Sequence, residues 1–338
     1  MALAFSSLSD FTALLEDMSG PDHAAIKGAQ ERDAQLTKPP GALGRLEDLA
    51  LWYCGWRGDA RARVTAPQVI VFAGNHGVVA QGISAFPAEV TAQMVANFKA
   101  GGAAVNQLAE IVGARMDVHA LDLDCPTGDI SLGPAMSEDE MLTALHTGWD
   151  AVDTASDLLV VGEMGIGNTT SAAAIALALY GGDAPGWTGR GTGLADAALA
   201  HKAQVVAQAV AVNEVAGVSG LEVLRRLGGR ELVAMAGAMA RARALHVPVV
   251  LDGFICTAAA ACLEAVCPGA LDHAVAGHVS QEPGHARLLK ELDKEPLLSL
   301  GLRLGEGSGG VLAMTVVQAA LACHAGMATF VEAGVSEA

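Results

Sequence analysis

The sequence is poor in basic and in aromatic residues. Of its 338 residues, 20 are lysine or arginine and 37 are aspartate or glutamate, which gives a formal net charge of −17 at pH 7. Proteins that bind nucleic acid or anionic membranes neutralise phosphates with a basic face, so we expect neither as a partner. Aromatic residues make up 4% of the chain and hydrophobic residues 52%. Small aliphatic side chains are therefore expected to fill a large, closely packed core.

Cysteine and histidine patterns typical of metal sites are also absent. No two of the six cysteines form a CxxC pair, and no two histidines form an H-x-x-x-H pair, so neither a zinc site nor a redox motif is indicated. We expect no metal and no redox cofactor, and we expect buried free thiols. The cysteines are Cys54, Cys125, Cys256, Cys262, Cys267 and Cys323.

Signals for export, membrane insertion and P-loop chemistry are missing too. The uninterrupted apolar runs fall short of the roughly 18–20 residues that a membrane span needs. The N-terminal segment carries no basic n-region of a signal peptide. No Gly-Lys-Ser or Gly-Lys-Thr follows a glycine-rich loop, which excludes a P-loop. A cytoplasmic enzyme or binding protein is the expectation.

The chain changes character near residue 67. Residues before it show helical spacing, with a rigid loop at Lys38-Pro-Pro-Gly41. After it, short β-rich runs alternate with alanine-rich helical segments such as residues 195–212 and 231–245. This alternation predicts parallel βαβ units and a doubly wound sheet. Residues 311–331 again show helical character and are expected to pack against the N-terminal helices. The predicted strands comprise residues 69–72, 116–121, 158–161, 247–251 and 274–276.

Small and polar residues follow each predicted strand. In open α/β sheets, ligands bind beyond the carboxyl ends of the strands. Five such ends therefore favour one composite site, although strand-to-helix turns are rich in glycine and aspartate in any case. The segments are residues 74–77, 122–124, 162–163, 252–253 and 277–280.

Two glutamates share one local arrangement. An apolar run, residues 157–162, precedes Glu163, and another, residues 300–305, precedes Glu306. Each glutamate is followed by a glycine-rich turn and the start of a helix, where backbone N–H groups favour an anion. A phosphate-bearing substrate and a general base could therefore share one pocket.

Two motifs leave alternatives open. Gly165-x-Gly167 resembles a dinucleotide fingerprint without its third glycine, so an NAD-dependent oxidoreductase is a weak alternative. Asp122 and Asp124 faintly suggest an acidic diphosphate-binding loop, but the two carboxylates are not adjacent and a simple turn is the favoured interpretation. Neither motif identifies a function alone.

A third motif, Arg190-Gly-Thr-Gly193, precedes a helix that carries Lys202. The helix start offers N–H donors and the lysine a mobile positive charge for a phosphate. A turn followed by a solvated lysine is the alternative. His76 and His278 have no spaced histidine partner, so we expect them to orient a substrate or a loop rather than to bind a metal.

A series of motifs runs through nearly the whole chain. They are Lys38-Pro-Pro-Gly-Ala-Leu-Gly-Arg-Leu46, Ala73-Gly-Asn-His-Gly-Val-Val79, Gly162-Glu-Met-Gly-Ile-Gly-Asn-Thr-Thr170, Gly189-Arg-Gly-Thr-Gly193, Leu251-Asp-Gly-Phe254, His278-Val-Ser-Gln-Glu-Pro-Gly-His285 and Leu302-Arg-Leu-Gly-Glu-Gly-Ser-Gly309. In this order they resemble the nicotinate-nucleotide:5,6-dimethylbenzimidazole phosphoribosyltransferases, a family that makes the lower-ligand nucleotide of cobalamin. The late Glu-Gly motif is highly specific in its context.

The resemblance implies a fold and an assembly. It implies an α/β fold with a Rossmann-like parallel sheet flanked by helices in a large catalytic domain, residues 61–310. A small helical domain would be formed by residues 1–60 and 311–338. The protein would be a homodimer in which the neighbouring subunit helps to wall the active site.

The resemblance also implies roles for individual residues. Glu306 would be the general base, and Glu163 would lie close to the reacting centre. The expected phosphate- and nucleotide-binding residues are Gly165, Gly167, Asn168, Gly191, Thr192, Gly193, Lys202 and Ser280. The expected base-pocket residues are Ser84, Phe86, Gln93, Met164 and Leu304. Which base the pocket prefers stays open.

The implied reaction suits these residues. The 5-phosphoribosyl group would pass from nicotinate mononucleotide to 5,6-dimethylbenzimidazole, giving α-ribazole 5′-phosphate and nicotinate. The pyridinium ring leaves without a proton from the protein, and a carboxylate removes the N–H proton of the attacking base. This chemistry requires neither a metal nor a redox cofactor. A nucleotide-binding sensor without catalysis is the alternative, although two carboxylates would not help it to bind phosphate.

Overall fold

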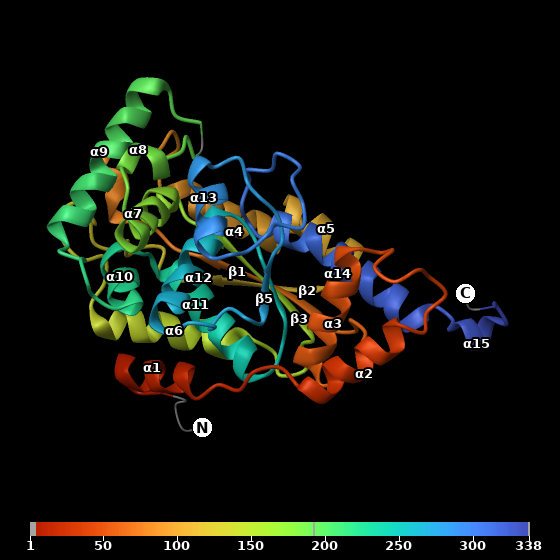
Figure 1. The fold of residues 1–338 in the computed structure, drawn as a ribbon. Helices are drawn as coiled ribbons and strands as arrows, with labels where there is room; N and C mark the ends of the chain where they lie inside the picture. The colour runs from red at the N-terminus through yellow and green to blue at the C-terminus, as the bar shows by residue number, and fades with distance from the viewer. Residues whose placement is uncertain (1–4, 192, 337–338) are drawn as a thin grey trace.

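The structure, a computed structural model, describes residues 5–191 and 193–336. A five-stranded parallel sheet with the order β2-β1-β3-β4-β5 lies at its centre, and helices cover both faces (Figure 1). The order reverses between β1 and β3, as in doubly wound folds. The strands are β1 (Pro67–Ala73), β2 (Arg115–Ala120), β3 (Leu158–Met164), β4 (Val249–Leu251) and β5 (Ala274–Ala276).

All five predicted strands are confirmed, and four of them differ from the prediction at their ends. β1 is longer at both ends, and β2 begins and ends one residue earlier than predicted. β4 begins at Val249 rather than at Val247, since the intervening Pro248 has no N–H to donate to a ladder. β3 continues to Met164, so Glu163 lies on the strand itself rather than after it. The ladder to β1 is what extends β3, because Glu163 pairs with Phe72 of that strand.

The helices alternate with the strands along the chain. The described helices are α1 (Leu8–Glu16), α2 (His23–Asp33), α3 (Arg45–Arg57), the 3-10 helix η1 (Gly77–Gln81), α4 (Glu89–Lys99), α5 (Ala104–Val112), α6 (Glu138–Ala151), α7 (Asn168–Tyr180), α8 (Ala184–Trp187), α9 (Asp196–Val212), α10 (Gly220–Leu227), α11 (Arg230–Ala244), α12 (Phe254–Val266), α13 (Pro283–Glu291), α14 (Ser308–Gly326) and α15 (Phe330–Ala333).

Alternate residues of the central strands face opposite layers. On β1, Val69 and Val71 belong to the core formed with α3, α4, α5 and α14. Ile70 and Phe72 belong to the core formed with α6, α7, α11 and α12. Because both faces are buried, the central strands read as continuous hydrophobic runs rather than as alternating ones.

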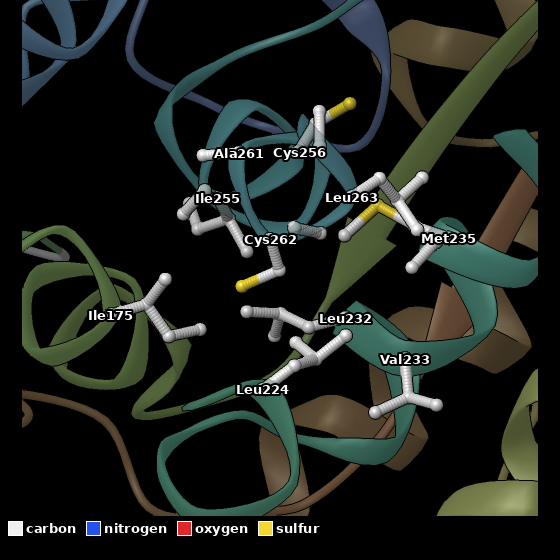
Figure 2. Close-up of a cluster of buried hydrophobic side chains, with 14 of the residues drawn as sticks. Ile175, Leu224, Leu232, Val233, Met235, Ile255, Cys256, Ala261, Cys262 and Leu263 are labelled. Carbon is white, nitrogen blue, oxygen red and sulfur yellow. The ribbon is translucent and has the colours of Figure 1, made fainter. Parts of the chain in front are cut away.

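The larger core is built from small and branched side chains. Figure 2 shows Ile175 of α7, Leu224 of α10, Leu232 of α11 and Cys262 of α12 converging between four helices. The expectation of buried free thiols holds for Cys54, Cys256 and Cys262. It is wrong for Cys125, which is exposed, and Cys267 and Cys323 are partly exposed.

The C-terminal helix α14 packs with α2 and α3 on one side of the sheet. Arg32 of α2 donates hydrogen bonds to the carbonyls of His324 (2.8 Å) and Met327 (2.9 Å), so the expected packing of the C-terminal helix on the N-terminal ones is confirmed. The chain before α2 goes elsewhere: the Phe5 ring stacks on His146 of α6 at 4.1 Å. The division into two domains stays a prediction.

Ion pairs hold the Lys38-Pro-Pro-Gly41 loop in place. The Lys38 ammonium pairs with the carboxylates of Asp33 (2.8 Å) and Glu47 (2.9 Å), which join α2 to α3. A few residues later, the Arg45 guanidinium donates to the carbonyl of Pro296 (2.8 Å). This motif therefore anchors the segment that leads towards Glu306.

α14 is, by length and composition, the one described helix that could cross a membrane. Buried core helices pass the same test, and 56% of its apolar window is buried inside the protein. Val311, Met314 and Val317 of this helix pack in the core beneath the sheet. Its apolar character is accounted for by that packing.

Candidate active site

A cavity of about 730 Å³ lies at the carboxyl edge of the sheet. Its wall includes Glu163 and Met164 at the end of β3, Gly253 after β4 and His278 after β5. Its volume is in the range of sites for nucleotide-sized ligands. The predicted convergence of strand ends is thus found for three strands.

Most of the predicted site residues line this cavity. They are Ser84, Phe86, Glu163, Met164, Gly165, Gly167, Asn168, Gly191, Lys202, Ser280, Leu304 and Glu306. Gly193 and the exposed Gln93 are not part of the lining, and Thr192 lies outside the described residues. Glu282 also lines the cavity and was not predicted as a site residue. Its only signal was its position two residues after Ser280 in the His278-Val-Ser-Gln-Glu-Pro-Gly-His285 motif.

Glu306 lies in a turn of unusual backbone conformation. The φ angles of Gly305, Glu306 and Gly307 are +83°, +65° and +87°. These values lie in the left-handed region, which disfavours every residue except glycine. The turn presses against Gly162 of β3, where an added Cβ would lie 2.3 Å from the carbonyl oxygen of Glu306. The glycines therefore permit a tight turn that brings the Glu306 carboxylate to the end of β3.

The Asp252 carboxylate holds this turn through hydrogen bonds. Its carboxylate accepts hydrogen bonds from the N–H groups of Gly307 (3.1 Å) and Gly310 (2.8 Å). These donors belong to the start of α14, which has no side-chain cap of its own. His278 Nε2 lies 3.3 Å from the Asp252 carboxylate. Burial alone would raise the pKa of Asp252, but His278 and the N–H groups of Gly310 and Gly253 hold it below its usual value.

Glu306 has the properties of a base that works near neutral pH. Burial, and secondly the negative charge of Asp252, raise the pKa of Glu306 to about 7. Its Oε2 atom is buried and has no hydrogen-bond partner among the described residues. A general base is most effective when its pKa is close to the working pH, so this carboxylate is suited to accept a proton inside the cavity.

Glu163 differs from Glu306 in its surroundings. It accepts a hydrogen bond from the amide of Asn168, at the start of α7. Burial raises the pKa of Glu163 well above its usual value, and the negative charges of Asp252 and Glu231 raise it further. Both carboxylates of the cavity therefore bind a proton more readily than a carboxylate in water does.

Another part of the cavity wall offers hydrogen-bond donors. Lys202 of α9 is 1% exposed, and its ammonium donates to Thr169 Oγ1 (2.7 Å) and to the Gly189 carbonyl (3.2 Å). The solvated-lysine alternative is therefore wrong. Burial lowers the pKa of Lys202 to about 8. An ammonium has three N–H donors, so the two bonds leave a third.

Ser280 also lines the cavity and is held in place by a histidine. The N–H of Ser280 donates to Nδ1 of His285 (2.9 Å), and the Ser280 hydroxyl lies 3.0 Å from the same nitrogen. Nε2 of His285 lies 3.0 Å from the Thr257 hydroxyl. Burial lowers the pKa of His285 to about 3, so the ring is neutral and its Nδ1 acts as an acceptor.

The mouth of the cavity is apolar. Phe86 and Leu304 line it and are 49% and 58% exposed, and Met164 lies on the wall with Ile83. Such a surface suits a flat aromatic ring. Ser84 accepts a hydrogen bond from the N–H of Phe86 (3.2 Å).

Two other sequence motifs lie outside the cavity lining. Asp122 and Asp124 are exposed, and the N–H of Cys125 donates to the Asp122 carbonyl, so the simple turn is correct. His76 is buried, and its Nε2 lies 2.5 Å from Glu231 Oε1. This pair joins the loop after β1 to the start of α11.

The Glu231→Leu substitution is expected to lower the free energy of unfolding by about 1–3 kcal/mol, because it leaves a buried histidine donor without its acceptor. The matched control is Glu31→Leu, which breaks the exposed Lys27–Glu31 pair and should cost less than about 1 kcal/mol. Urea unfolding of both variants measures the difference. Equal effects would show that the buried pair stabilises no more than a surface pair does.

Fold and cavity together define the class: a Rossmann-like α/β protein whose ligand site lies at the carboxyl edge of its sheet. The family model described as "Phosphoribosyltransferase" matches residues 18–335, and the chain belongs to this family. The protein is therefore an enzyme of the phosphoribosyltransferase class, and the oxidoreductase interpretation of the Gly165 motif is wrong.

Curated relatives and solved structures agree with the family. The chain is 68% identical over 337 residues, and all of both chains, to nicotinate-nucleotide--dimethylbenzimidazole phosphoribosyltransferase of Ruegeria pomeroyi. It is 65% identical to the protein of the same name from a Jannaschia species, over 98% of both chains. The crystal structure of CobT from Thermus thermophilus is similar with a TM-score of 0.87 and 42% identity, covering 93% of this chain and 100% of that one.

Proposed function

We propose that the protein transfers the 5-phosphoribosyl group from nicotinate mononucleotide to 5,6-dimethylbenzimidazole, in the assembly of the cobalamin nucleotide loop. The observation that carries the proposal is the combination of groups that line one cavity. Its wall brings together the Lys202 ammonium, the two glutamates Glu163 and Glu306, and apolar side chains. The names of the relatives supply the identity of the two substrates.

The donors around Lys202 would hold the nucleotide phosphate. Charge-assisted hydrogen bonds to phosphate are short and strong, and the third N–H of Lys202 is available for one. The start of α7, which has no side-chain cap, adds the positive end of a helix dipole. The apolar residues Phe86, Met164 and Leu304 would hold the acceptor base.

The chemistry at C1′ then balances without further groups. The bond from C1′ to the nicotinate nitrogen breaks, and its electron pair returns to the ring, so the pyridinium leaves as a neutral ring. One nitrogen of the benzimidazole forms the new bond to C1′ from the opposite face, which gives the α product. The proton on the other nitrogen passes to the carboxylate of Glu306.

Glu163 would act on the positive charge of the ribosyl group. As nicotinate leaves, C1′ gains positive charge, which a nearby carboxylate stabilises. The raised pKa of Glu163 disfavours its ionised form in this structure. The positive charge of a bound pyridinium nucleotide would lower that pKa. Binding of the nucleotide therefore favours the ionised form of Glu163 beside the cation.

The assembly and location belong to the same proposal. We propose a cytoplasmic homodimer in which residues 1–60 and 311–338 form a small helical domain beside the catalytic domain, residues 61–310. Half-exposed apolar side chains at the cavity mouth, Phe86 and Leu304, support a partner subunit over this edge, because such groups gain from being covered.

Product analysis tests the reaction. The purified protein is incubated with nicotinate mononucleotide and 5,6-dimethylbenzimidazole, and the mixture is resolved by mass-detected chromatography. We expect equal amounts of nicotinate and α-ribazole 5′-phosphate. No product with any benzimidazole, purine or phenol would contradict the proposal and favour the sensor alternative.

A further inference from the structure

Glu282 lies in the part of the cavity that the phosphate would occupy. It precedes α13 and is 9% exposed. Its Oε1 atom accepts a hydrogen bond from the N–H of Gly191 (3.1 Å). A carboxylate is thus bonded to one of the donors that a phosphate group would use.

The Glu282 carboxylate is pressed tightly onto the 189–191 loop. A Cβ added at Gly189 would lie 1.9 Å from Glu282 Oε2, so only glycine allows this approach. Oε2 itself is buried and has no hydrogen-bond partner among the described residues. A buried carboxylate oxygen without a donor is unusual, and it adds negative charge in the part of the cavity where an anion is expected.

Lys202 does not neutralise this charge directly. Burial lowers the pKa of Lys202, and the negative charge of Glu282 offsets part of that lowering, so the two groups interact through space. Among the described residues, no ion pair of 4.0 Å or less joins Lys202 to a carboxylate, and its hydrogen bonds go to Thr169 and Gly189. The lysine therefore keeps a free N–H for a ligand while the glutamate uses the Gly191 donor.

We propose that Glu282 is a specificity-determining residue that weakens the binding of anions at this site, so that free inorganic phosphate does not occupy it. The inference rests on the proposed function. Like charges in a buried site repel strongly, and a phosphate must either displace the carboxylate from Gly191 or lie beside it. A nucleotide offsets this repulsion with its ribose and base contacts, whereas free phosphate has no other contact to offset it.

The Glu282→Gln variant separates charge from position. The glutamine oxygen can still accept the Gly191 N–H, but the side chain carries no charge. We expect inorganic phosphate to bind this variant at least tenfold more tightly than the wild type. The measurement is titration calorimetry with inorganic phosphate alone, supported by the inhibition constant of phosphate against nicotinate mononucleotide.

The matched control is Glu291→Gln at the other end of α13, outside the cavity lining. It makes the same change of net charge and should leave phosphate binding unchanged. Thermal unfolding checks that each variant folds. Phosphate binding to Glu282→Gln that is equal to or weaker than wild-type binding, or absent in both, would overturn the proposal and leave Glu282 as a support for the loop.

The calorimetric measurement of phosphate binding does not require the protein to catalyse the proposed reaction. A protein that makes no ribazole phosphate but shows the expected gain in phosphate affinity would contradict the proposed reaction and keep the role of Glu282. Turnover in the wild type, without a gain in phosphate affinity in Glu282→Gln, would support the proposed reaction and contradict the role of Glu282.

Discussion

The Glu306→Gln variant is expected to lose about 10²–10⁴-fold in kcat, the usual contribution of a general base. The Michaelis constant for nicotinate mononucleotide should change little, because Lys202, the proposed donor for its phosphate, is held by Thr169 and Gly189 and not by Glu306. Glutamine has nearly the same size as glutamate, so it should preserve the turn. Initial rates with both substrates near saturation give the two constants separately.

The pH profile tests the same role independently. Only the ionised form of Glu306 accepts a proton, and its pKa is raised to about 7. The wild-type rate should therefore rise with pH through about 7, and Glu306→Gln should lack this rise. A variant profile of the same shape and height as the wild type would remove Glu306 from the reaction.

The raised pKa of Glu306 also predicts a change in stability with pH. Its folded-state pKa of about 7 lies above the usual value of 4.5, so the stability linked to this group is fully present below about pH 4.5 and is lost as the pH rises through 7. Glu306→Gln should therefore gain thermal stability relative to the wild type at pH 8 but not at pH 4.5.

Gly162→Ala should inactivate the protein although position 162 carries no functional group. The added methyl would lie 2.3 Å from the Glu306 carbonyl oxygen and 2.6 Å from the Gly307 nitrogen, both backbone atoms that cannot rotate away. Either β3 or the turn must shift, at a cost of about 1–3 kcal/mol in stability. A displacement of about 1 Å at a catalytic group can cost about 10²-fold in rate, so we expect at least that loss.

The control for Gly162→Ala is Gly326→Ala, which adds the same methyl to the far end of α14, where no heavy atom lies within 4 Å. It should keep both activity and stability. Steady-state rates and urea unfolding of the two variants give the comparison. If Gly162→Ala retained full activity, the contact between β3 and the turn would not position Glu306.

Much of the fold could be predicted from the sequence because each β-rich run is buried on both faces or ends in small polar residues. Because ligands bind at the carboxyl ends of parallel strands, Glu163, Gly253 and His278 could be predicted to lie at one edge of the sheet, and they line one cavity there. The order of the strands and the close contact of Gly162 with the Glu306 turn depend on pairing between distant segments. No local pattern records such pairing.

The parts of the site that were missed have similar causes. Asp252 was expected only as a polar strand end, yet it holds the start of α14, 55 residues away in sequence from Gly307. On α4, Val90 and Met94 line the cavity while Gln93 is exposed, because helical phase decides which side chains face inward. The boundaries of that helix were not predicted, so its phase was unknown.

The left-handed conformation of Glu306 has a consequence for engineering. A side chain at φ +65° costs roughly 1–2 kcal/mol that glycine would not incur. The position is thus one where the protein is less stable than it could be in order to keep its base. A library screened for heat resistance alone would be enriched in Glu306→Gly, so variants of this protein should be selected for turnover and thermal tolerance in the same round.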